Sequence, residues 1–126
     1  MQRKFLVGVV AIWSLCAMGQ TSIKIIPAGD RSETADRVGY SLKETVRNSR
    51  SFALNDSADI TLYYLDIERT DSCGRPEHFL SFVVVGKSPR TWVQQKSIAV
   101  TGKFTSERLR DISESILSTI EGSLAP

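Results

Sequence analysis

Hydrophobic and polar positions follow a helical period in two parts of the chain. In the first part, Asp30 lies three residues before Glu33, an acid-headed version of the capping box that begins helices. Gly39 lies on the same segment, where we expect the helix to approach a neighbouring element closely. Apolar residues recur here at helical spacing and line one face: Ala35, Val38, Leu42 and Val46.

The second helical pattern lies near the end of the chain. Thr105 can cap this helix, and Phe104 before the cap and Leu109 after it form a hydrophobic staple. A broad apolar stripe follows, made of Leu109, Ile112, Ile116, Leu117, Ile120 and Leu124. Such a stripe needs a partner surface, and a sheet is the simplest one.

Four segments have the composition of β-strands: residues 22–26, 60–69, 79–85 and 92–100. The segment 79–85 is nearly all apolar, which predicts a central strand covered on at least part of both faces. The more polar segment 92–100 is expected nearer an edge. Short connections at 71–77 and 86–90 hold the Gly, Pro, Asp and Ser residues of hairpin turns, which predicts an antiparallel meander.

The order of these elements is β-α-β-β-β-α, without a linker or an internal repeat. We therefore predict an α+β fold, a two-layer sandwich in which two helices pack on an antiparallel sheet of three to four strands. A chain of 126 residues with 24% charged and 41% hydrophobic residues fits one folded domain.

The first residues have the three parts of a secretory signal. Arg3 and Lys4 form a basic start, residues 5–16 are largely apolar, and residues 17–19 offer small side chains for cleavage. The apolar run is shorter than the roughly 20 residues that span a bilayer. We predict a signal peptide at 1–19; an uncleaved anchor and a core helix remain as alternatives.

Removal of this segment changes the charge and the cysteine count. The domain of residues 20–126 would keep 14 basic and 14 acidic residues, so it lacks the basic excess behind most nucleic-acid and anionic-lipid binding. Leu15 before Cys16 does not fit a lipoprotein signal. We expect a secreted or periplasmic protein that binds no nucleic acid and has no stable membrane anchor after cleavage. Cys73 would be its one cysteine, free or bridged to another molecule.

Reactive side chains gather only around the turn that holds Cys73. A thiol near Arg75, with His78 as a base, has the residue types of an activated cysteine. The same composition is typical of a plain hairpin turn with an exposed thiol, and no spacing places His78 on Cys73. We interpret the segment as a turn, with a covalent partner site and catalysis as alternatives.

Other chemistry finds no support. Residues 81–88 only approach a phosphate-binding loop, because Ser81 replaces the first glycine and the segment is a strand. One histidine and one cysteine cannot complete a structural zinc site, and no calcium loop or G-x-S-x-G elbow is present. Asp66 and Glu68 are expected in a solvated patch. We predict no catalytic, cofactor-binding or metal-binding residues, no cofactor and no enzymatic activity.

Aromatic residues on the sheet are the remaining clue. Tyr63 and Tyr64 are adjacent on one strand, so their side chains point to opposite faces. If both helices cover one face, a tyrosine, with Phe79 or Trp92, faces outward as a candidate partner surface. The alternative is that these aromatic side chains fill a lopsided core.

One stretch resembles a known family. Residues 38–42, then Val46, then residues 49–54 (SRSFAL) are similar to the first helix and following strand of TolB N-terminal-like envelope domains. The whole chain also resembles short secreted bacterial proteins of unknown function. The resemblance implies an envelope protein that acts by contact. We therefore expect a non-enzymatic binding module with an envelope or secreted protein partner; a thiol-dependent activity or covalent tether through Cys73 is the alternative.

Overall fold

The computed structural model describes residues 20–87, 90–102 and 104–124. The predicted signal at 1–19, with Cys16, lies outside the described residues, as do Ser88 and Pro89 of the second turn. The elements are β1 (Thr21–Pro27), α2 (Glu33–Arg47), β2 (Phe52–Leu54), β3 (Ile60–Thr70), β4 (Pro76–Gly86), β5 (Trp92–Thr101) and α3 (Ser106–Leu124).

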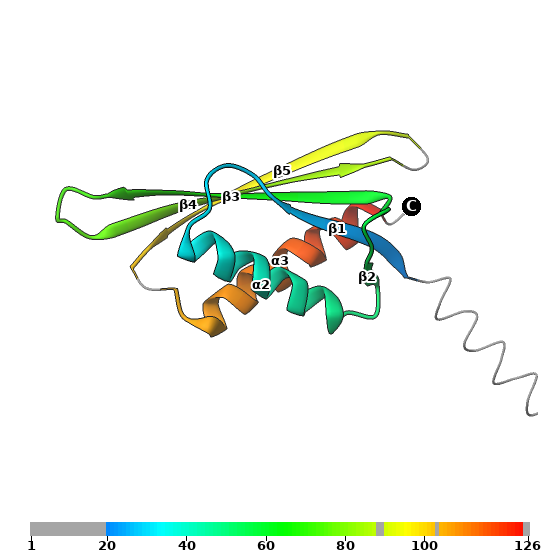
Figure 1. Ribbon diagram of the computed structural model, residues 1–126, viewed down its shortest axis with the longest axis horizontal. Coiled ribbons are helices and arrows are strands. Elements are labelled where there is room, and N and C mark those ends of the chain that lie inside the picture. Colours follow the sequence, from blue (N-terminus) through cyan, green and yellow to red (C-terminus); the bar gives the residue numbers. More distant parts are fainter. Residues whose placement is uncertain (1–19, 88–89, 103, 125–126) are drawn as a thin grey trace, which may run out of the picture.

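The fold is α+β with two layers, as predicted, and both helices lie against the same face of the sheet (Figure 1). Strand β5 is an edge strand, which confirms the expectation for residues 92–100. No helix within the described residues is long and apolar enough to cross a bilayer.

The prediction of three to four antiparallel strands was wrong in number and partly in direction. In the described part of the chain the sheet has five strands in the order β2-β1-β3-β4-β5, and β1 runs parallel to both of its neighbours. Strand β2 has only three residues, too few for an alternating pattern to reveal. The helix between β1 and β3 forms a crossover, and a crossover joins parallel strands, whereas short turns join β3, β4 and β5 in antiparallel order.

The core lies between the sheet and the two helices. Alternate residues of the inner strands point into it: Ile23 and Ile25 of β1, Ile60, Leu62 and Tyr64 of β3, and Leu80, Phe82 and Val84 of β4. The predicted helical faces supply the other half, with Ala35, Val38, Leu42 and Val46 from α2 and Leu109, Ile116, Leu117 and Ile120 from α3.

The N-cap residue was predicted correctly for one of the two helices. Thr105 accepts a hydrogen bond from the Arg108 backbone N–H at 3.1 Å, which confirms it as the α3 cap. For α2 the predicted Asp30 cap is wrong. Ser32 has the extended backbone of a cap, and its hydroxyl accepts from the Ala35 N–H at 3.0 Å. Both residues suit a cap, and the serine lies one residue before the first helical turn.

The close approach expected at Gly39 is present. The ring of Tyr64, on the face of β3 that the helices cover, reaches the α2 backbone there, and a Cβ at position 39 would overlap its hydroxyl. A side chain larger than hydrogen would therefore separate the helix from the sheet.

Candidate binding surfaces

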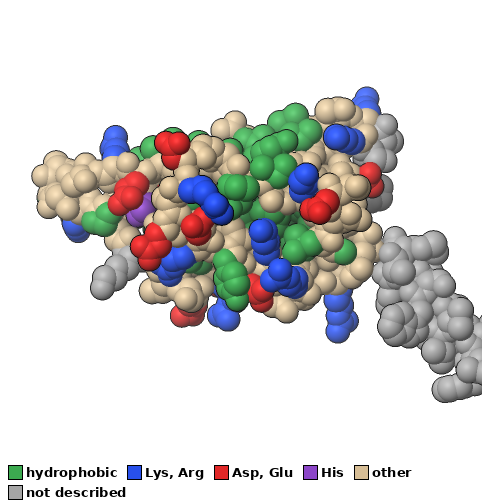
Figure 2. All heavy atoms as spheres, viewed as in Figure 1, with side chains coloured by type: hydrophobic (Ala, Val, Ile, Leu, Met, Phe, Trp, Pro, Cys, Tyr) green, Lys and Arg blue, Asp and Glu red, His purple; other side chains and the backbone are tan. Residues whose placement is uncertain are grey.

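One face of the sheet carries no helix in the described part of the chain, and its middle is apolar. The residues that point to it alternate with the core residues along each strand. Its apolar members are Ile26, Tyr63, Leu65, Ile67, Phe79, Val83, Val85, Val93 and Ala99. We call this set the open face. Hydrophobic side chains gather over the sheet in the upper part of Figure 2.

Three large side chains of the open face are exposed to solvent, and its other large members are half-buried. The exposed fraction is 37% for Tyr63, 53% for Ile67 and 66% for Val93. Charge is confined to its borders: Arg69 pairs with Glu77 at 3.0 Å and lies over the Phe79 ring at 5.2 Å. Contiguous apolar surface bordered by polar residues is typical of interaction sites.

The structure places two of the three predicted surface aromatics on the open face. Tyr63 lies opposite Val83, and Phe79 lies opposite Ile67, all on the open face. Trp92 lies on the other side of the sheet, where its ring packs over Gly86 and against the core. The cause is its register: Trp92 pairs with the buried Gly86 and therefore shares the covered face.

Cys73 lies at the turn between β3 and β4, as expected of a hairpin. The Asp71 carboxylate accepts backbone hydrogen bonds from Cys73 at 2.9 Å and from Arg75 at 2.8 Å. Gly74 has a φ of +78°, the left-handed conformation that closes this turn. The thiol is exposed and free.

His78 is not a partner of Cys73 in this structure. It is buried on the covered face, where its Nδ1 lies 3.0 Å from Oδ1 of Asp66, and its ring meets Phe104 edge-on at 5.0 Å. The Ser32 hydroxyl donates to the other Asp66 oxygen at 3.4 Å. The carboxylate thus lies between the hydroxyl and the imidazole, an order in which the imidazole does not accept the serine proton.

The expectation of a solvated patch at Asp66 is also wrong. The Asp66 side chain is 1% exposed, because it shares the strand parity of the core residues Leu62 and Tyr64. Glu68 has the same parity but is exposed. The sequence did offer a signal. If the strand pairs are counted outward from the turn at Asp71, Asp66 and His78 fall on the same face of the hairpin.

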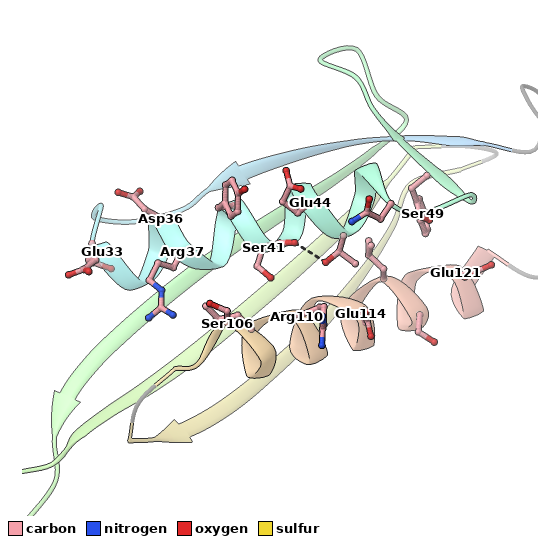
Figure 3. Close-up of a pocket in the computed structure, with 18 of the residues that line it drawn as sticks. Glu33, Asp36, Arg37, Ser41, Glu44, Ser49, Ser106, Arg110, Glu114 and Glu121 are labelled. Atoms are coloured by element: carbon pink, nitrogen blue, oxygen red, sulfur yellow. Dashed lines mark hydrogen bonds between the residues drawn. The ribbon is translucent and has the colours of Figure 1, made fainter.

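A groove of about 950 Å³ runs between the two helices on the side away from the sheet (Figure 3). Ser41 and Ser113 join the helices at its floor, with 3.0 Å between their hydroxyl oxygens. Arg37 donates to the Phe104 carbonyl at 2.7 Å, and the other charged side chains along its rim are of both signs. No cluster of metal-ligating side chains is found among the described residues.

Comparison with known proteins gives the fold and no family. No family model matches the chain, and no curated protein matches it. Among solved structures, a PelC dodecamer from Paraburkholderia phytofirmans is similar, with a TM-score of 0.54, 14% identity and coverage of 79% of this chain and 85% of that one. Rare lipoprotein B from Shewanella oneidensis has a TM-score of 0.52, 13% identity and coverage of 81% and 95%.

A hypothetical protein from Chlamydia trachomatis is similar to the same extent, with a TM-score of 0.54, 9% identity and coverage of 82% and 96%. At these identities the likeness concerns the fold alone. The chain therefore shares its architecture with PelC, with one protein named as a lipoprotein and with one named as hypothetical. The resemblance to TolB N-terminal domains stays a prediction.

Proposed function

We propose that the chain is a non-enzymatic binding module, secreted or periplasmic, that binds a protein partner through the open face. The observation that carries the proposal is the group of apolar side chains around Tyr63, Ile67 and Phe79 on the face opposite the helices, where, within the described residues, only the turn at Gly29 lies against a member, Leu65. Leaving such surface in water costs about 25 cal/mol for each Å² that a partner could bury. Binding would recover that free energy.

The distribution of charge specifies the chemistry of the partner. The centre of the open face is uncharged, and its border carries Lys24 and the neutralised pair of Arg69 and Glu77. A complementary partner presents a flat surface of aliphatic and aromatic side chains with few charges at its centre. Nucleic acid does not fit, because residues 20–126 have balanced charges and phosphate binding needs a basic excess.

Two further observations support an envelope location. The first residues have the composition of a secretory signal, and similar structures include one named as a lipoprotein. The non-enzymatic part rests on the site chemistry of the described residues: the Cys73 thiol is exposed in the β3–β4 turn, whereas the His78 imidazole is buried against Asp66 on the covered face.

The test compares two single variants in partner capture from the envelope of the source cells. Ile67→Glu places a charge among the apolar side chains of the open face, and the control Tyr40→Ser removes an exposed aromatic side chain from α2. We expect partners that bind the wild type to bind Ile67→Glu at least about 10-fold more weakly and Tyr40→Ser normally. Equal binding of Ile67→Glu and the wild type would reject the open face as the site.

A covalent tether through Cys73 is the second candidate. Its thiol is exposed at the end of the long β3–β4 hairpin (left in Figure 1). An intact mass that falls when reductant is added, and that does not fall in Cys73→Ser, would identify an attached group. An unchanged mass, together with alkylation no faster than in an unfolded peptide, would reject the tether.

A further inference from the structure

Within the described residues no strand pairs with the outer edge of β5, so its outward hydrogen-bonding groups have no strand partner there. Strand β5 pairs with β4 over its whole length in one unbroken register, from Trp92 opposite Gly86 to Thr101 opposite Glu77. Beyond its end, the Gly102 N–H donates to the Pro76 carbonyl at 3.3 Å, which fixes which residues face β4. Antiparallel pairs alternate, so every second residue directs its N–H and C=O away from β4: Val93, Gln95, Ser97, Ala99 and Thr101.

This edge has few of the features that usually protect edge strands, the inward-pointing Lys96 apart. Strand β5 has ten residues with no proline and no bulge, whereas the opposite edge, β2, has only three residues. The one charged side chain of β5 is Lys96, which points to the covered face and donates to the Ser115 hydroxyl at 3.1 Å. We propose that the β5 edge pairs with the β5 edge of a second copy of this chain, so that two sheets join into one.

Symmetry selects the register of this pairing. A two-fold axis perpendicular to the joined sheet keeps the helices of both copies on the same face, so each residue meets one of the same parity. With the axis at Ser97, that residue faces its own copy, Gln95 faces Ala99, and Val93 faces Thr101. Each of these pairs exchanges two backbone hydrogen bonds, so all the unpaired residues named above are used.

Charge favours the same register. Centring the pair on Lys96 would place two lysines opposite each other, which is unfavourable. Centring it on Ser97 places Lys96 opposite Ile98, so no like charges meet along the strand. The balance of 14 basic and 14 acidic side chains in residues 20–126 means that net charge does not oppose association.

The helical layer accommodates a second copy. Helix α3 lies under β4 and β5, where Ile116 and Ile120 share a small cavity with Phe82 and Val84. A second β5 would place the second α3 two strand spacings away, about 10 Å, which is an ordinary distance for packed helices. The side of α3 beneath β5 carries small side chains at this junction: Ser115, Thr119 and Ser123.

The first test is the mass of the purified protein in solution, measured by light scattering over a range of concentrations. We expect twice the monomer mass. Ser97→Pro removes the central edge N–H without touching the β4 ladder and should give a monomer, whereas Ser97→Ala should stay a dimer. A wild-type monomer at all concentrations, including one whose β5 edge instead takes a strand of another protein, would overturn the proposal.

A cross-link tests the register and does not depend on the proline variant folding. In a background with Cys16→Ser and Cys73→Ser, Ser97→Cys should form a disulfide-linked dimer, because facing Cα atoms lie about 5.5 Å apart. The control Gln95→Cys should not, since its two copies lie about 13 Å apart along the strands. Cross-linking through position 95 and not 97 would overturn the register. The variant Ile67→Glu, two strands away, should leave the dimer intact, so this proposal and the proposed function fail separately.

Discussion

The two faces of the sheet both carry many apolar side chains, but these side chains are buried on one face and at least partly exposed on the other. On the covered face, Leu62, Leu80 and Phe82 are at most 2% exposed beneath the helices. On the open face, Ile67 and Val93 are more than half exposed, although both are aliphatic side chains on the same sheet. The comparison teaches that hydrophobicity alone does not report burial: the number of helices decides how much of an apolar sheet a chain can cover, and the remainder is available for contact.

The largest difference between the faces should appear in stability. Leu62→Ala removes a fully buried side chain and should lower the free energy of unfolding by about 3 kcal/mol, because it leaves a cavity. Ile67→Ala on the same strand should lower it by less than about 1 kcal/mol. Urea denaturation of both variants measures the contrast, and equal losses would mean that the open face is covered in solution.

A smaller loss of stability is expected at the end of the covered face that carries polar side chains. Asp66→Ala removes the carboxylate that binds the buried His78, and should cost about 2 kcal/mol, since the imidazole loses a charged hydrogen-bond partner. Glu68→Ala, an exposed acid two residues along, is the matched control and should change stability by less than about 0.5 kcal/mol. If Asp66→Ala leaves the free energy of unfolding unchanged, the cost of burying the carboxylate equals the stabilisation from its hydrogen bond to His78.

The smallest effect concerns the pKa of a tyrosine on the covered face. Burial raises the pKa of Tyr64 above its ordinary value of 10.0; the Asp36 carboxylate raises it further, and Arg31 lowers it. The unfolded chain then loses this proton at a lower pH than the folded chain, so stability is complete below pH 10 and falls as pH rises through the folded pKa. The absorbance titration of the wild type minus Tyr64→Phe should show one phenol that ionises above pH 10. A transition at or below that value would contradict the burial.

Sequence patterns predicted most of the fold because the helical stripes and the strand segments are long. Strand β2 escaped because three residues carry no period, and the parallel direction of β1 depended on recognising the helix as a crossover. The candidate surface was predicted in part: parity placed Tyr63 and Phe79 correctly once the helices were on one side, while Trp92 needed its register with Gly86. The bond between Asp66 and His78 was missed because it joins two strands across a turn of fixed length.

The place of β1 in the sheet has a consequence for how the chain folds. Strands β3, β4 and β5 are joined by short turns and can pair as soon as they are made, whereas β1 fits between β2 and β3, both of which follow it in the sequence. Closing the α2 crossover costs more chain entropy than closing a hairpin, so we expect the meander to form first. Before β1 and the helices pack on it, that intermediate exposes two unpaired strand edges and two apolar faces. We therefore expect it to be the species most prone to aggregate and to bind a chaperone.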